Sequence, residues 1–321
     1  MATIGTKGTI KPYANFNAAD DVQKLRNAMK GAGTNEDAVI DVIANRSLAQ
    51  RQEIKSAYKL SVGKDLEDDL RSELTGNFEN VIIGLITPAT QYDVEELKKA
   101  MKGAGTDEGC LIEILASRSA EEMRNINAAY KLKYGKSLED DICSDTSFMF
   151  QRVLVSLACG GRDQGNTVDE ALAKQDAKEL YEAGEKKWGT DEVKFLTILC
   201  TRNRNHLLKV FEEYKKISKK DLEASIKSEM SGHLEDALLA VVKCMRSKPG
   251  YFAERLYKSM KGLGTDDSTL IRVMVSRCEI DMLEIRSEFK KMYGKSLHSF
   301  IKGDCSGDYR KVLLKLCGGE D

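Results

Sequence analysis

The chain has 321 residues, with 50 Lys and Arg residues against 51 Asp and Glu residues and only 3 prolines. Its net charge of −1 excludes a strongly basic nucleic-acid-binding protein and a polybasic membrane anchor, so we expect no nucleic-acid partner. The longest apolar runs, such as residues 81–86, fall far short of the roughly 20 residues that a membrane-spanning helix needs.

The chain consists of four copies of one unit, preceded by a short tail. Three copies contain a turn of the form Lys-Gly-x-Gly-Thr, and the third copy reads Lys-Lys-Trp-Gly-Thr. An arginine follows 13 residues, and an aromatic residue 25 residues, after the last glycine of each turn. Extra residues between copies two and three predict a linker. The predicted segments are a loosely ordered tail over 1–15, repeats over 16–87, 88–159, 171–243 and 247–318, and a linker over 160–170.

Apolar residues recur with helical spacing inside every copy. In the first copy they stand at positions 78, 81, 82, 85 and 86, which places them on one continuous face of a helix. The same offsets recur in the other three copies, and glycines at 63, 135 and 294 divide the middle of the unit. We therefore predict about five short helices per repeat and an all-α fold of about twenty helices.

The threonine that ends each glycine turn is predicted to cap the next helix. Threonine is a common N-cap residue, and acidic residues follow it, as expected for the first turn of a helix. The four predicted caps are Thr34, Thr106, Thr190 and Thr265.

A carboxylate stands 40 residues after the last glycine of each turn, close to a predicted helix end. The four acidic residues are Glu73, Asp145, Glu229 and Asp304. Glycines let the turn curl so that carbonyl oxygens point outward, and such oxygens favour a hard cation such as Ca²⁺. Three carbonyls and one bidentate carboxylate supply about five oxygens, whereas Ca²⁺ takes about 6–8. The pattern predicts four weak Ca²⁺ sites, each completed by water or by a lipid phosphate.

An apolar or aromatic residue stands at the tip of each turn, between or beside the glycines. A soluble protein gains little by exposing such a side chain, so we expect these residues to contact a membrane. They are Ala32, Ala104, Trp188 and Leu263.

The repeated turn and its distant carboxylate resemble those of the annexin family across nearly the whole chain. The resemblance implies four five-helix repeats in a right-handed superhelical, curved disc. It also implies the Ca²⁺ ligands by position, with the first loop ligand of repeat three moved one residue upstream. These ligands are Met29, Gly31, Gly33 and Glu73; Met101, Gly103, Gly105 and Asp145; Gly184, Lys187, Gly189 and Glu229; and Met260, Gly262, Gly264 and Asp304.

The resemblance further implies a polar central passage and a cellular role. The charged positions of the passage are matched by Asp93, Glu96, Arg118 and Arg272. An ion conduit and a buried salt-bridge network are both open, and we favour the network. We expect a cytoplasmic protein without a signal peptide that docks on anionic phospholipid membranes when Ca²⁺ rises. Lateral self-association on membranes, membrane aggregation or fusion, and a part in exocytosis follow from the resemblance alone.

Other functional classes have less support. The two Gly-Lys-Ser strings lack the upstream glycine of a phosphate-binding loop, and no segment has the spacing of an EF-hand. The three histidines lie far apart with no catalytic motif, so we predict a protein that is not an enzyme. A calcium-independent helical-repeat scaffold for protein partners is the alternative that fits the repeats.

Overall fold

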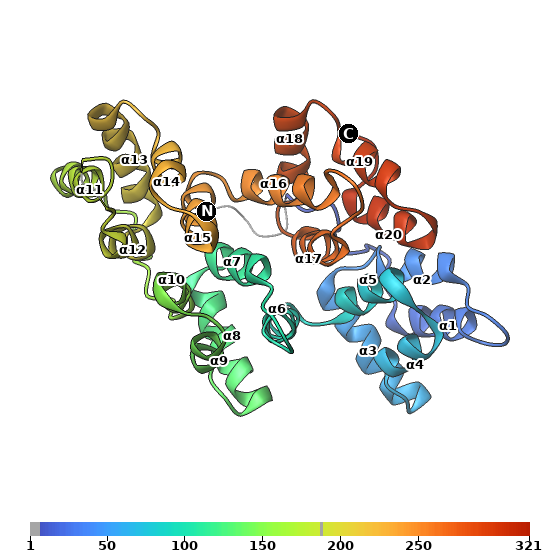
Figure 1. Cartoon of the computed structure of the whole chain (residues 1–321). Coiled ribbons are helices and arrows are strands. Elements are labelled where there is room, and N and C mark those ends of the chain that lie inside the picture. Colours follow the sequence, from blue (N-terminus) through green and yellow to red (C-terminus); the bar gives the residue numbers. More distant parts are fainter. Residues whose placement is uncertain (1–6, 187–188) are drawn as a thin grey trace. The chain divides into compact units, whose positions relative to one another are not determined.

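The helices predicted from the apolar spacing are present. The computed structural model describes residues 7–186 and 189–321. Within these residues the chain forms twenty α-helices and no β-strand, which confirms the all-α fold class and the five helices per copy (Figure 1). The chain divides into two units, one formed by Met1–Ala89 with Pro249–Asp321 and the other by Thr90–Lys248.

Each copy contributes five helices in the same order. The first two copies contain α1 (Ala18–Ala28), α2 (Glu36–Ile43), α3 (Leu48–Val62), α4 (Leu66–Glu73) and α5 (Gly76–Ile86), then α6 (Ala89–Ala100), α7 (Glu108–Ser117), α8 (Ala120–Tyr134), α9 (Leu138–Asp145) and α10 (Phe148–Ala158). The last two contain α11 (Glu170–Ala183), α12 (Glu192–Thr201), α13 (Arg204–Ser218), α14 (Leu222–Glu229) and α15 (Gly232–Arg246), then α16 (Lys248–Met260), α17 (Asp267–Arg277), α18 (Met282–Tyr293), α19 (Leu297–Asp304) and α20 (Gly307–Cys317).

The fifth helix of a copy carries its apolar stripe into the core. In α5 all five residues of the predicted stripe are buried. This helix packs against α17 and α20 in the first unit, and α15 packs against α7 and α10 in the second (Figure 1). Each core is therefore built by two copies, because one five-helix repeat leaves apolar surface that a second repeat covers.

The aromatic landmark of each copy joins the third helix to the fourth. Tyr58, Tyr130, Tyr214 and Phe289 are all buried. The hydroxyl of Tyr58 donates to Oδ2 of Asp69 at 2.5 Å, and that of Tyr130 donates to Asp141. These bonds link α3 to α4 and α8 to α9, so they help to place the short helices that end at the predicted Ca²⁺ carboxylates.

The described part of the tail is packed on the repeats rather than loosely ordered as predicted: residues 7–10 contact the fourth copy, and Tyr13 contacts Arg46 and Gln50 of the first. The backbone N–H groups of Thr9 and Ile10 both donate to the carbonyl of Cys278, at 2.8 and 3.1 Å. The Thr9 hydroxyl also donates to the carbonyl of Leu316 at 2.5 Å. Gly8 allows this approach, because a Cβ at this position would lie 2.5 Å from the Glu279 backbone.

We expect Gly8→Ala to release the tail from the fourth copy. The added methyl group collides with backbone atoms that cannot move aside, so the two N–H bonds to Cys278 should break. Hydrogen exchange at Thr9 and Ile10 should then accelerate by at least about tenfold. Gly303→Ala is the matched control, because its Cβ meets no atom within 4 Å. Unchanged exchange in the Gly8 variant would contradict the close packing.

None of the helices in the described residues is both long and apolar enough to cross a lipid bilayer.

Candidate calcium sites

The predicted loops connect the first and second helices of each copy. In the first copy Gly31 and Gly33 have φ angles of +96° and +87°, a conformation that side chains other than glycine rarely adopt. The corresponding glycines of copies two and four are also left-handed: Gly103, Gly105, Gly262 and Gly264. The paired glycines are therefore required by the backbone path, and they make the loop curl as the sequence predicted.

The curled loops leave carbonyl oxygens without internal partners. In copies one, two and four, within the described part of the chain, no hydrogen bond is accepted by the carbonyls of the six left-handed glycines. A backbone hydrogen bond joins the two ends of each loop, such as that from the Asn35 N–H to the Ala28 carbonyl at 2.8 Å. Exposed and unpaired carbonyl oxygens on a rigid turn suit a hard cation, which replaces the missing hydrogen bonds.

The carboxylate 40 residues away reaches its loop in all four copies. The hydroxyl of Thr34 donates to Oε2 of Glu73 at 2.8 Å, and that of Thr190 donates to Oε2 of Glu229 at 3.1 Å. The other two pairs are Thr106 with Asp145 and Thr265 with Asp304. The fold thus brings together the loop and the carboxylate that the sequence paired only by spacing.

These contacts correct the prediction that the threonines are N-caps. The N-cap residue is the next one along the chain in every copy, and its side chain accepts the capping bond from the first turn. The true caps are Asn35, Asp107, Asp191 and Asp266. The threonine hydroxyl is therefore free to orient the carboxylate, a role that sequence reasoning missed.

Each of these carboxylates terminates a short helix. The helices α4, α9, α14 and α19 all have eight residues, and each ends at its acidic residue. A helix C-terminus carries partial negative charge, so a carboxylate there is unfavourable unless a cation is close. The same unfavourable placement in four copies is the arrangement expected of cation ligands.

The third loop is one residue longer than the others. It is closed by a bond from Asp191 N–H to the Ala183 carbonyl, whereas the first loop is closed by Asn35 and Ala28, which are one residue closer in sequence. This insertion agrees with the predicted upstream shift of the first ligand to Gly184, which is buried. Gly189 has a left-handed φ of +86°. The predicted ligand Lys187 and the predicted membrane-contact residue Trp188 lie outside the described residues.

The described tip residues are exposed. Ala32 and Ala104 project from their loops, and the side chain of Leu263 is fully exposed. An exposed leucine beside a cation site gains free energy when it enters an apolar layer, because burial of such a side chain is worth roughly 1.5–3 kcal/mol. Their contact with a membrane stays a prediction.

The residues predicted for the central passage lie in both units. Within the second unit Arg118 donates two bonds of 2.8 Å to the carboxylate of Asp93, and Glu96 is half-buried. Arg272 is buried in the first unit. The geometry inside the second unit is that of a salt bridge, and a passage formed by all four residues stays a prediction.

The Asp93–Arg118 pair belongs to a repeated feature that sequence reasoning found only in part. The repeated arginine forms a two-bond ion pair with an aspartate of the first helix in copies one to three: Asp21 with Arg46, Asp93 with Arg118 and Asp176 with Arg202. In the fourth copy Phe252 occupies the aspartate's position. There Arg277 lies over the Phe252 ring at 4.4 Å and pairs with Asp281 instead.

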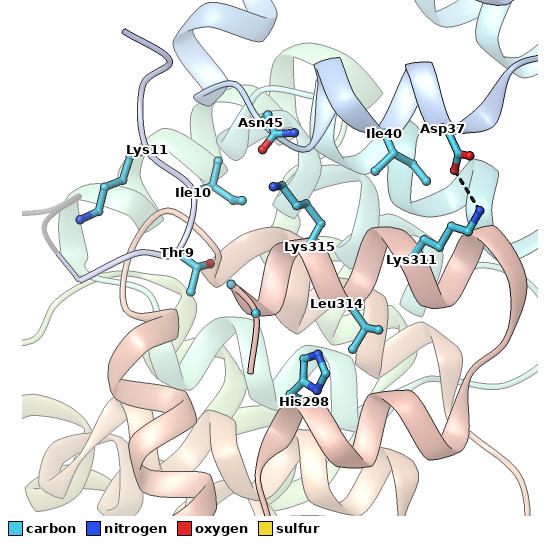
Figure 2. A pocket seen from close by; sticks show the side chains of 12 residues that line it. Thr9, Ile10, Lys11, Asp37, Ile40, Asn45, His298, Lys311, Leu314 and Lys315 are labelled. Atoms are coloured by element: carbon cyan, nitrogen blue, oxygen red, sulfur yellow. Dashed lines mark hydrogen bonds and ion pairs between the residues drawn. The ribbon is translucent and has the colours of Figure 1, made fainter. Parts of the chain in front are cut away.

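A separate cavity of about 600 Å³ in the first unit is not a Ca²⁺ site. Figure 2 shows Lys11, Lys315 and His298 around it, with Lys311 paired to Asp37 at 2.9 Å. Three ammonium groups disfavour a divalent cation. Among the described residues, no group of three or more His, Cys, Asp or Glu side chains could hold a metal ion.

The fold and the loops define a class of all-α protein with four five-helix repeats, in which a carboxylate at the end of a short helix is held against a glycine loop. The sequence model described as Annexin matches residues 20–85, 92–157, 175–241 and 251–316. The chain belongs to the annexin family. Annexins are not enzymes, which confirms the prediction of a non-enzymatic protein.

Similar proteins cover the whole chain. Annexin A4 of Sus scrofa is 74% identical over 321 residues, which is all of both chains, and this confirms the resemblance to the annexin family. The solved structure of annexin III superposes with a TM-score of 0.97 at 52% identity and covers 99% of each chain. The structure of calcium-bound annexin (Sm)1 has a TM-score of 0.86 at 35% identity and covers 97% of this chain and 93% of its own.

Proposed function

We propose that this protein binds Ca²⁺ at its four loops and thereby docks reversibly on anionic phospholipid membranes. The observation that carries the proposal is the arrival of a carboxylate, held by a threonine, at each curled loop. Membership of the annexin family, which includes the calcium-bound annexin (Sm)1, supports the choice of cation.

The incomplete ligand set explains why calcium and lipid would bind together. In copies one, two and four the loop carbonyls and the bidentate carboxylate supply about five oxygens, so a lipid phosphate oxygen can complete the shell of about 6–8. One carboxylate per site predicts weak binding without lipid, in the range of about 10⁻⁴ to 10⁻³ M. We assign the sixteen ligands named from the sequence to these sites, with Gly184, Lys187, Gly189 and Glu229 in the third.

Sedimentation with vesicles that contain phosphatidylserine tests the proposal. The protein should pellet at millimolar Ca²⁺ and stay in the supernatant with excess chelator, because chelation removes the bridge between carboxylate and phosphate. Vesicles of phosphatidylcholine alone are the control for the headgroup. Equal pelleting with and without chelator would contradict the proposal and favour the calcium-independent scaffold.

We also propose a cellular role that follows from attachment through several loops. A protein with four Ca²⁺-bridging loops can hold to a bilayer by several weak contacts at once, which favours reversible and concentration-dependent attachment. Lateral self-association on the membrane and aggregation of vesicles, as in exocytosis, would follow from such attachment. Vesicle turbidity that rises with protein and Ca²⁺, and reverses with chelator, tests this role.

A further inference from the structure

The turn that follows the Ca²⁺ carboxylate has one unusual residue, in the second copy. The fifth helix of every copy begins with a residue in the left-handed conformation, and three of these residues are glycines: Gly76 at +67°, Gly232 at +64° and Gly307 at +62°. In the second copy the residue is Phe148, with a φ of +55°. A residue with a bulky side chain is strained in this conformation, so the second copy has backbone strain at a position where the other three copies have none.

Packing does not explain the phenylalanine. The side chain of Phe148 is 89% exposed, so it contributes little to the core. A Cβ built on any of the three corresponding glycines would meet no atom within 4 Å, which shows that this position points into open space. A strained and exposed aromatic residue that supports no internal contact calls for a function outside the folded chain.

The position of Phe148 connects it with the second Ca²⁺ site. It follows Asp145 by three residues and lies with Asp145 along a recess of about 360 Å³ in the second unit. The recess also has hydroxyl groups from Thr146 and Ser147. The same patch of surface therefore holds the carboxylate of the Ca²⁺ site, polar groups and an exposed aromatic ring.

The loop of the second copy lacks a large apolar tip. Its tip residue is Ala104, whereas the tip of the fourth copy is Leu263, which is fully exposed. Phe148 supplies an exposed apolar group beside the carboxylate of the second site, because both residues line the same recess. The partner that suits a cation site with an exposed ring beside it is a lipid surface, since the phosphate meets the cation and the ring meets the apolar layer.

We propose that Phe148 is a membrane-contact residue, which enters the interfacial layer of the bilayer when Ca²⁺ at Asp145 binds a lipid phosphate. The inference rests on the proposed Ca²⁺-dependent docking. Backbone strain in the free protein is then the structural consequence of placing an aromatic ring where the other copies place glycine.

Phe148→Gly should weaken membrane binding without lowering the stability of the fold. Glycine removes the strain, so the thermal midpoint should rise or stay the same. Affinity for vesicles that contain phosphatidylserine should fall by about tenfold at saturating Ca²⁺, because burial of one aromatic ring is lost. A lower midpoint together with unchanged affinity would mean that the residue is structural and would overturn the proposal.

Leu132→Ala is the matched control. Leu132 is also 89% exposed, but it precedes α9, whereas Phe148 follows the carboxylate end of that helix. Vesicle affinity should therefore be unchanged in this variant. An equal loss of affinity in the two variants would show a general effect of surface hydrophobicity and would overturn the assignment of Phe148.

Depth-dependent quenching gives a second readout. Phe148→Trp in a Trp188→Phe background contains a single tryptophan, since the chain has one Trp. Its fluorescence should be quenched by brominated lipid with Ca²⁺ and not with chelator. If the chain binds vesicles but no quenching occurs, Phe148 has another partner, such as a protein, and only this inference fails. If the wild-type chain does not bind vesicles with Ca²⁺, the proposed function fails as well.

Discussion

Removal of the four loop carboxylates is expected to abolish Ca²⁺-dependent binding to vesicles that contain phosphatidylserine. Several weak bridges act together, so their joint loss should lower apparent affinity by more than about 100-fold. Sedimentation across a Ca²⁺ series measures the loss. The four changes are Glu73→Gln, Asp145→Asn, Glu229→Gln and Asp304→Asn.

The fold of this variant should remain intact. Each carboxylate ends a helix, where negative charge is unfavourable, so its replacement by an amide should not lower the thermal midpoint. A control with the same change in net charge distinguishes the sites from general electrostatics. It exchanges four exposed acidic residues away from the loops: Glu121→Gln, Asp140→Asn, Glu170→Gln and Glu320→Gln. Strong vesicle binding by the loop variant, or its loss in the control, would contradict the assignment.

Asp93→Ala is expected to destabilise the second unit by about 3–5 kcal/mol, because it leaves the guanidinium of Arg118 buried without its carboxylate. Both side chains are nearly inaccessible, with exposed fractions of 4% for Arg118 and 11% for Asp93. Burial disfavours the charge on Arg118, but the Asp93 carboxylate outweighs it, so the pKa of Arg118 is raised. Urea unfolding followed by circular dichroism measures the change in the free energy of unfolding.

A double replacement tests whether the charge pair itself is required for folding. Asp93→Leu with Arg118→Met removes both charges, so the unit should recover most of the stability that Asp93→Ala loses. The fourth copy shows that this aspartate is replaceable when another carboxylate serves the arginine, because Phe252 stands in its place and Arg277 pairs with Asp281. A single Asp93→Ala change that costs less than about 1 kcal/mol would show that water reaches the pair and would contradict a buried network.

Local patterns were sufficient to predict the helices and the loops. The apolar stripe of α5 has helical spacing in the sequence, and its residues are buried because a helix can bury only one such face against its neighbours. Glycine pairs such as Gly31 and Gly33 predicted a curled loop, since few other residues accept their left-handed φ angles.

Contacts between residues far apart in the sequence could not be predicted without the structure. Thr34 has the usual chemistry of an N-cap, and only the structure shows that Asn35 is the cap while Thr34 binds a carboxylate 39 residues away. The aspartate partners of the repeated arginines were obscured by the longer third loop and by Phe252 in the fourth copy. Likewise, the repeats align Phe148 with Gly76, Gly232 and Gly307, but only the structure shows that the residue at this position is left-handed and that the ring is exposed.

The most direct test of Ca²⁺ as a bridge is to measure Ca²⁺ binding itself, by equilibrium dialysis with and without vesicles that contain phosphatidylserine. If a lipid phosphate completes each site, lipid must tighten Ca²⁺ binding by the same factor by which Ca²⁺ tightens lipid binding. The account predicts a binding curve that moves to lower Ca²⁺ concentration when vesicles are present, and no such shift in the variant without loop carboxylates. Identical curves with and without vesicles would contradict it.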